Sequence, residues 1–268
     1  MQLSKNVLNL FLFGDCRFEA KASLIGDSPE LMDHIRLRLY GHPASVSCEK
    51  HAMPPCALLE ALPLLQRLAL AYATPATRPA LIALLALDAR LAAIVRSSRE
   101  PMLAQLRLAW WREQLGGSGG TPAVGDPLLE ALRDWPGSTA VLAELADGWE
   151  AMTGAAPLPA SAIAALAEAR GAAFAALADA DSSRAALRMG RNWALADIAG
   201  HLSDTGERKA ALALAREQNW RQERLPRGLR PLAVLHGLAA RAVFRDNPAA
   251  ELTPGEAFAA IRIGLLGR

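Results

Sequence analysis

The chain has few of the residues that stabilise small secreted proteins or line nucleic-acid interfaces. Its 268 residues include three cysteines, Cys16, Cys48 and Cys56, and an odd number makes a disulfide framework unfavourable. Because C-x-x-C spacing is also missing, we expect free thiols in a reducing compartment rather than a zinc site. The 29 basic and 27 acidic side chains nearly cancel, so no dense basic stripe is available and nucleic acid is excluded as a partner.

Long apolar runs and strand patterns are also scarce. The most apolar stretch, residues 79–95, carries Asp88 and Arg90 near its centre and is shorter than the roughly 20 residues that cross a bilayer. We therefore expect no transmembrane segment. The chain begins with no convincing secretion signal, and no sustained apolar–polar alternation predicts a β-strand. Since 52% of the residues are hydrophobic, the chain is too apolar to be disordered, and we expect a folded cytoplasmic protein.

The composition changes at Met53. The 52 residues before it contain three of the four lysines but only four alanines, whereas alanine makes up nearly a quarter of the residues that follow. Two explanations stay open: Met53 starts the native protein, or residues 1–52 are a variable extension. Residues 1–52 are therefore predicted to be an atypical N-terminal extension, which under the first explanation is not native. Residues 53–268 are predicted to form one domain.

Helical periodicity dominates after residue 57. Leucines from Leu58 to Leu68 recur three or four residues apart and predict a first helix that closes at Thr74 and Pro75. Alanine-rich helices of this kind favour close packing in an all-α bundle. Further helices are predicted over residues 77–96, 101–115, 127–134, 138–152, 161–179, 182–202, 210–220, 231–244 and 255–266, with Thr77, Ser161 and Ser182 as N-caps.

Two neighbouring tryptophans mark the segment after residue 100. Its apolar stripe is formed by Leu103, Leu106 and Trp110, while Arg107 and Trp111 are four residues apart and share a helix face beside Leu103. One interpretation is packing, in which one tryptophan enters the core, the other covers an interface, and Arg107 stacks on Trp111. The other interpretation gives Arg107 and Trp111 a role in substrate binding.

These segments resemble the squalene/phytoene synthase family. The resemblance rests on LIALLALDARL (81–91), the following Glu-Pro and RLAWWR (107–112), with support from LPRGLRPL (225–232). It covers residues 58–268 and points more narrowly to a divergent branch of alphaproteobacterial type, which is similar to the mitochondrial complex I assembly factor of that fold. The resemblance implies an all-α, isoprenoid synthase-like bundle around a central apolar cavity.

Active members of that family join two prenyl diphosphates head to head. Carboxylates on facing helices hold Mg²⁺, which neutralises the diphosphate as it departs. The resemblance places the first carboxylate cluster at Ala92, Ala93 and Arg96, and none of these side chains can hold a cation. Asp88 lies one turn earlier, and we expect it to pair with Arg90 or Arg96 or to make a cap-like contact.

The second acidic motif is only partly degraded. The resemblance places Asp197 where the family has asparagine, and His201 and Thr205 where it has aspartates. Asp197, His201 and Asp204 are spaced i, i+4, i+7, so one helix face could present all three as a residual diphosphate or single-metal site. The alternative is a hydrogen bond between Asp197 and His201 near a helix end, with Asp204 in the turn. Because Mg²⁺ prefers several oxygen ligands, this alternative is favoured.

An arginine cluster follows the second motif. Guanidinium groups suit diphosphate oxygens, anionic lipid headgroups or acidic partner surfaces, and the same pattern is equally typical of a solvated linker. The cluster, interleaved with Trp220 and Pro226, consists of Arg221, Arg224, Arg227 and Arg230.

The missing first carboxylate cluster predicts a pseudoenzyme that needs no cofactor. We expect a binding or assembly factor, and analogy with the divergent branch suggests a respiratory complex as its target. The protein is then expected to be peripheral to the inner membrane and to bind a protein partner there. The expected ligand is a prenyl diphosphate or another apolar molecule, bound through Arg107, Trp111, Asp197, His201 and Asp204.

Two alternatives stay open. The first is an active Mg²⁺-dependent head-to-head prenyltransferase, or a prenyl-diphosphate binder, in isoprenoid biosynthesis. Its additional acidic residues from other helices would be Asp147, Glu150, Asp179 and Asp181. The second is a helical interaction module unrelated to isoprenoids, which predicts no deep apolar cavity between the helices.

Overall fold

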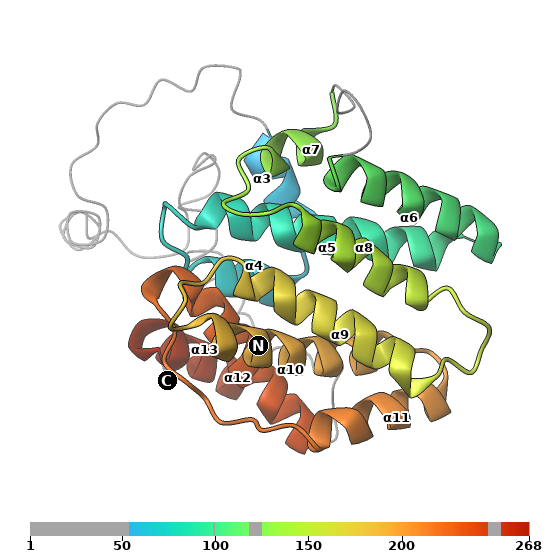
Figure 1. The fold of residues 1–268 in the computed structure, drawn as a ribbon. Helices are drawn as coiled ribbons and strands as arrows, with labels where there is room; N and C mark the ends of the chain where they lie inside the picture. The colour runs from blue at the N-terminus through green and yellow to red at the C-terminus, as the bar shows by residue number, and fades with distance from the viewer. Residues whose placement is uncertain (1–53, 99, 118–124, 246–252, 268) are drawn as a thin grey trace, which may run out of the picture. The chain divides into compact units, whose positions relative to one another are not determined.

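α-Helices build the part of the chain that the computed structural model describes, residues 54–98, 100–117, 125–245 and 253–267, and no strand occurs in these ranges (Figure 1). The all-α prediction is therefore confirmed. The expected extension, residues 1–52, and most of the Gly-rich break after α6 lie outside the described residues. The helices are α3 (Pro54–Glu60), α4 (Leu64–Leu70), α5 (Arg78–Ser97), α6 (Pro101–Leu115), α7 (Pro127–Leu132), α8 (Ala140–Ala151), α9 (Ala160–Ala175), α10 (Ser183–His201), α11 (Thr205–Arg216), η1 (Arg227–Leu229), α12 (Arg230–Phe244) and α13 (Pro254–Leu266).

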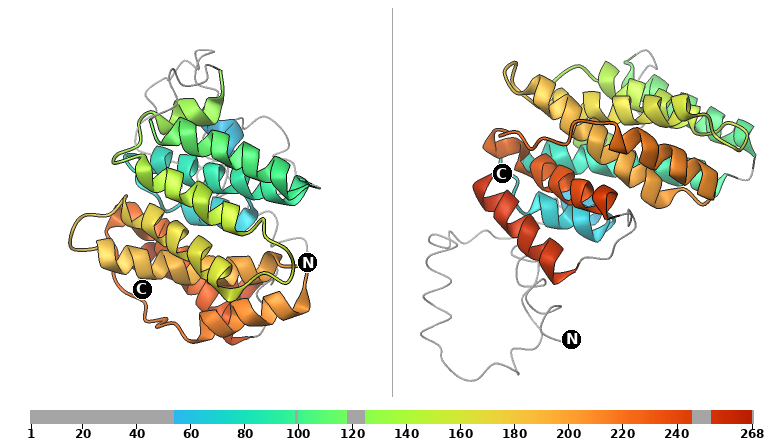
Figure 2. Two further views of the ribbon diagram at one scale, coloured as in Figure 1. Left: turned by 45° about the vertical axis from the view of Figure 1, so that its right-hand side comes forward. Right: turned by 90° about the horizontal axis from the view of Figure 1, so that it is seen from below.

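The longer helices stack side by side around an aliphatic core. α9 packs along α10 and also along α8, while α6 lies against α8, α12 against α10, and α13 against α12 (Figures 1 and 2). Fully buried side chains include Leu85, Leu145, Leu166 and Phe174. Within the described ranges, no helix combines the length and the apolarity needed to cross a membrane.

Pro63 divides the first predicted helix in two. The leucine spacing predicts one helix from Leu58 to Thr74, but α3 ends at Glu60 and α4 begins directly after Pro63. A proline has no backbone N–H and its ring collides with the preceding turn of a helix. The leucine periodicity therefore continues across the break while the helix does not.

Thr77 and Ser182 occupy the predicted N-cap positions of α5 and α10, but their hydroxyl groups accept no hydrogen bond from the first turn. Thr77 precedes α5 as expected, but its hydroxyl donates to the Gly228 carbonyl oxygen, 3.0 Å away. Ser182 precedes α10, and its hydroxyl donates to an oxygen of Asp179. Ser161 lies inside α9, which begins one residue earlier. The hydroxyl groups of Thr77 and Ser182 therefore bind Gly228 and Asp179 instead of the first turn of the helix.

Glycines allow α9 and α10 to approach closely. A Cβ atom at Gly171 would lie 2.6 Å from the Leu187 carbonyl oxygen and 3.0 Å from the Arg191 nitrogen, and a Cβ atom at Gly190 would lie 3.0 Å from the Gly171 Cα atom. Interiors are packed too densely to absorb such overlaps, so a larger residue at either position would push α9 and α10 apart. Arg170 enters the bundle directly beside it.

Candidate functional site

A buried arginine links helices α5, α9 and α10. Arg170 projects from the buried face of α9 and is 5% exposed. Its Nε and Nη2 atoms donate to the two carboxylate oxygens of Asp88 on α5, at 2.9 and 2.8 Å. Its Nη1 atom donates to Asp197 Oδ2 on α10 at 2.9 Å. One guanidinium group therefore joins carboxylates from two other helices.

Two tryptophans enclose this guanidinium group. The Arg170 Cζ atom lies 5.0 Å from the ring centre of Trp149 on α8 and 5.3 Å from that of Trp193 on α10, where cation–π attraction contributes. The Trp149 indole N–H also donates to Asp88 Oδ1 at 2.8 Å. We call Asp88, Trp149, Arg170, Trp193 and Asp197 the Arg170 cluster.

Charge pairing keeps the arginine ionised in the interior. Burial alone would lower the pKa of Arg170, but the charges of Asp88 and Asp197 and their hydrogen bonds outweigh it and raise the pKa above its ordinary value. The guanidinium group is therefore a permanent internal cation. Asp197, whose side chain is 21% exposed, lies closer to solvent than Asp88, whose side chain is 7% exposed.

The predicted pairing of Asp88 with Arg90 or Arg96 is wrong. Arg90 lies 3.9 Å from Asp126 Oδ2, and Arg96 is exposed near the end of α5. Asp88 belongs to the buried face of α5, and a charge in an apolar interior is tolerated only when it is paired. Its partner, Arg170, is 82 residues away in the sequence, so no local spacing indicates it.

The predicted common face of Asp197, His201 and Asp204 does not form. α10 ends at His201, and Asp204 caps α11 by accepting from the Glu207 N–H at 2.8 Å. Asp197 turns inward to Arg170, whereas the His201 side chain is 61% exposed. The predicted contact between Asp197 and His201 is present, with His201 Nδ1 2.8 Å from the Asp197 carbonyl oxygen and 3.7 Å from Asp197 Oδ1.

Trp110 and Trp111 face different sides of α6. Trp111 is buried on the face that packs on α8 and α5, while Trp110 is 40% exposed and meets Trp111 edge-on at 5.2 Å. This agrees with the packing interpretation, except that the predicted stacking partner is wrong. The cation–π contacts of the described residues involve Arg170, and Arg107 is exposed.

The five predicted binding residues are not gathered into one site. Arg107 and Trp111 lie on α6, Asp197 and His201 on α10, and Asp204 at the start of α11. Among the described residues, no hydrogen bond, ion pair or ring contact joins the α6 pair to the other three. Their role in substrate binding stays a prediction.

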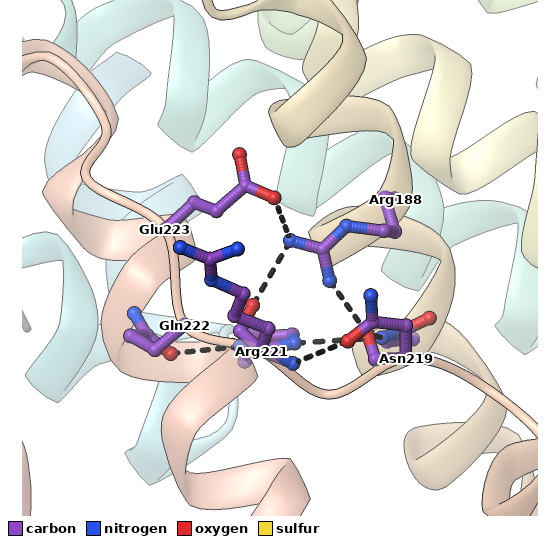
Figure 3. Close-up of polar contacts among 7 residues, drawn as sticks. Arg188, Asn219, Arg221, Gln222 and Glu223 are labelled. Carbon is purple, nitrogen blue, oxygen red and sulfur yellow. Dashed lines mark hydrogen bonds and ion pairs between the residues drawn. The ribbon is translucent and has the colours of Figure 1, made fainter.

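The arginine-rich segment after α11 is an ordered connection. It runs from residue 217 to 226 and is fixed to α10 by Arg188, which donates to the carbonyl oxygens of Asn219 and Arg221 and, at 2.7 Å, to Glu223 (Figure 3). The side chains of Arg221, Arg224 and Arg227 are exposed. The backbone of this segment is therefore a linker, as one interpretation predicts. The guanidinium groups of its exposed arginines remain open to solvent.

A buried histidine lies against this connection. The His236 ring, on α12, stacks on Trp220 with 5.1 Å between ring centres. Its Nδ1 atom donates to Gln222 Oε1 at 2.8 Å, because the Gln222 amide nitrogen donates to the Ala233 carbonyl oxygen. Burial, together with the positive charge of Arg188, lowers the pKa of His236 to about 3.

We expect His236 to make the fold sensitive to acid. The unfolded chain takes up a proton at this imidazole near pH 6.5, whereas the folded chain resists protonation down to about pH 3. Between these two pH values the unfolded state binds more protons than the folded state. The free energy of unfolding should therefore fall by roughly 1 kcal/mol for each unit by which the pH is lowered. Urea unfolding of the wild type and of His236→Phe at several pH values measures the effect. The wild type should show the steeper loss, and equal slopes would contradict the assignment.

A protein family matches the part of the chain that carries the Arg170 cluster. The family model, described as squalene/phytoene synthase, matches residues 67–205, more than half of the chain. The chain belongs to the squalene/phytoene synthase family. No curated protein and no solved structure gives a match. Membership confirms the predicted isoprenoid synthase-like all-α fold. The central apolar cavity stays a prediction, and so does the resemblance after residue 205.

The positions at which the sequence resemblance predicts the family's carboxylates do not fit a divalent cation. On α5, Ala92 and Ala93 have no ligand atom, and Arg96 carries a positive charge. His201 ends α10 and Thr205 begins α11, so these two positions do not share a helix face as carboxylates four residues apart would. Within the described ranges, no three His, Cys, Asp or Glu side chains gather as metal ligands.

Three of the four additional acidic residues that an active enzyme would use have partners elsewhere. Asp147 and Glu150 both bind Arg112 of α6, at 2.8 and 2.9 Å. Asp179 accepts hydrogen bonds from Ser182, which lower the pKa of Asp179. Asp181 is exposed in the same turn. None of these contacts reaches the Arg170 cluster.

Proposed function

We propose that this member of the squalene/phytoene synthase family is non-catalytic and acts as a binding or assembly factor. The observation that carries the proposal is the Arg170 cluster. Asp88 and Asp197 come from the two helices that, by the family resemblance, would carry the metal-binding carboxylates, and both are bonded to a guanidinium group of the chain itself. A covalently attached cation cannot be exchanged for Mg²⁺ while these hydrogen bonds persist.

The degraded motif positions support the same proposal. In prenyl transfer the diphosphate leaves as the allylic cation forms, and the family uses Mg²⁺ held by carboxylates to neutralise the departing charge. The side chains at the corresponding positions of this chain supply no carboxylate: Ala92, Ala93, Arg96, His201 and Thr205. We therefore propose that the protein works without a cofactor.

The proposed partner follows from the divergent branch that the sequence resembles. By analogy with the complex I assembly factor of that branch, we propose a respiratory complex at the inner membrane as the partner, with the protein cytoplasmic and peripheral to that membrane. This step rests on a fold-level analogy, because the same fold can host different functions. The Arg170 cluster supports only the non-catalytic part of the proposal.

Incubation of the purified protein with farnesyl or geranylgeranyl diphosphate and Mg²⁺ should release no diphosphate above the protein-free background. The physical reason is the lack of carboxylates that could concentrate Mg²⁺ at the diphosphate. An active family enzyme assayed in parallel shows that the substrates are competent. Mg²⁺-dependent release above background would overturn the non-catalytic proposal.

The assembly role has its own readout. Disrupting the gene in the source organism should lower NADH-dependent quinone reduction by its membranes while the isoprenoid pool stays constant. Unchanged quinone reduction would contradict the assembly role without affecting the non-catalytic proposal.

A further inference from the structure

Two helices of the bundle expose apolar stripes. The α6 stripe consists of Met102, Leu103, Leu106 and Trp110, which are 69%, 48%, 62% and 40% exposed. The α13 stripe consists of Phe258, Ile261, Leu265 and Leu266, which are 70%, 36%, 61% and 59% exposed. In both helices the opposite face is also apolar and packs into the bundle. Contiguous exposed apolar side chains of this kind mark interaction sites, so each stripe is expected to meet something beyond the described chain.

Charge distinguishes the two stripes. Between residues 100 and 181, a range that includes α6, eleven acidic side chains face only four basic ones. From residue 182 to residue 267, a range that includes α13, thirteen basic side chains outnumber eight acidic ones. The α6 stripe therefore lies in an acidic part of the chain and the α13 stripe in a basic part.

Arginines border the α13 stripe directly. Arg262 is exposed on α13 itself, Arg230 donates to a backbone carbonyl oxygen of α13 at 3.2 Å, and Arg245 lies 3.3 Å from Glu256 Oε1. Glu256 is the one acidic residue within α13, and it is buried in the capping box at the start of that helix. Because Glu256 offsets the charge of Arg245, the net positive charge beside the stripe comes from the exposed Arg262 and the half-buried Arg230. The described part of α13 has no exposed carboxylate.

We propose that the α13 stripe docks on the surface of an anionic lipid bilayer. Helices that present Phe and Leu on one face with Arg at the border bind membrane interfaces, because the apolar groups enter below the headgroups while the arginines attract lipid phosphates. The excess of acidic residues in the part of the chain that contains α6 disfavours the same surface for the α6 stripe. A second copy of the chain is a poorer occupant for the α13 stripe, because a two-fold contact would bring the arginines of both copies together.

Vesicle flotation of the full chain tests this docking. The wild type should float with vesicles of phosphatidylcholine and about one third phosphatidylglycerol, and far less with phosphatidylcholine alone or at high salt. Phe258→Ser and Leu265→Ser should each lower the partition coefficient about tenfold, since each removes a side chain that enters the bilayer. Arg262→Ala should lower the partition coefficient about fivefold, on anionic vesicles only.

Leu106→Ser is the matched control, because Leu106 is as exposed as Leu265 but belongs to the α6 stripe. It should float like the wild type. The proposal is overturned if the wild type does not float, if Leu106→Ser loses as much binding as Leu265→Ser, or if sedimentation shows that Phe258→Ser turns a dimer into a monomer. The docking rests on the proposed peripheral position at the membrane, and a wild type that does not float would contradict both. All these residues lie outside the Arg170 cluster, so every outcome leaves the non-catalytic proposal untouched.

Discussion

Replacing Arg170 by methionine should lower the free energy of unfolding by about 3 to 5 kcal/mol, as expected when one partner of a buried ion pair is removed. The variant keeps a long apolar side chain but leaves the carboxylates of Asp88 and Asp197 without their cation. The rings of Trp149 and Trp193 also lose the guanidinium group between them. Urea unfolding at neutral pH measures the loss.

Arg112→Met is the matched control for burial. Arg112 also joins two carboxylates of another helix, Asp147 and Glu150, but its side chain is 40% exposed. Exposed ion pairs contribute about 1 kcal/mol or less, so the control should lose little stability. A similar loss in both variants would show that burial of the Arg170 cluster is not the cause.

A triple variant separates charge from packing. Adding Asp88→Asn and Asp197→Asn to Arg170→Met removes both carboxylate charges and keeps an oxygen that can accept the Trp149 indole N–H. Most of the lost stability should return, because replacing a whole buried ionic group is far less costly than removing one member. No recovery would mean that lost packing, and not unpaired charge, explains the first variant.

Gly171→Ala should cost about 1 to 3 kcal/mol, which is the typical cost of overpacking an interior. The new Cβ atom would lie 2.6 Å from the Leu187 carbonyl oxygen, so α9 and α10 would have to separate. Because Arg170 precedes this glycine, the separation should also weaken its hydrogen bond to Asp197. Thermal unfolding followed by circular dichroism measures the loss.

Gly255→Ala is the corresponding control. Gly255 lies in the first turn of α13, and the nearest atom to its added Cβ would be Thr253 Oγ1 at 3.9 Å. Alanine forms helices more readily than glycine, so this variant should be neutral or slightly stabilised. A large loss at Gly255, or none at Gly171, would contradict the close-packing argument.

The helix positions were largely predictable, because they depend on local patterns. Apolar periodicity places α5, α8, α12 and α13 within a few residues of their observed bounds. Where the predicted bounds are wrong, another local feature of the sequence indicates the observed ones. Pro63 breaks the first helix, and Asp204 followed three residues later by Glu207 is typical of a helix start, which places α11 at Thr205 and not at residue 210.

The Arg170 cluster was only half predictable. Arg170 interrupts the apolar stripe of Ile163, Leu166 and Phe174 on α9, and Asp88 interrupts a leucine-rich face of α5. Buried charges require partners, so each residue indicates that a partner exists. The identity of the partner depends on how α5, α9 and α10 pack together. This packing is set by contacts between distant segments, such as the close contact of α9 with α10 at Gly171.

A tethered guanidinium group also changes what this protein depends on. A dissociable ion occupies its place only as often as the surrounding concentration permits, whereas a side chain is present in every molecule as soon as the polypeptide has folded. The contacts through which Arg170 joins α5, α9 and α10 therefore do not depend on the Mg²⁺ concentration. A partner that binds the outer surface of these helices therefore meets the same arrangement of α5, α9 and α10 at any Mg²⁺ concentration.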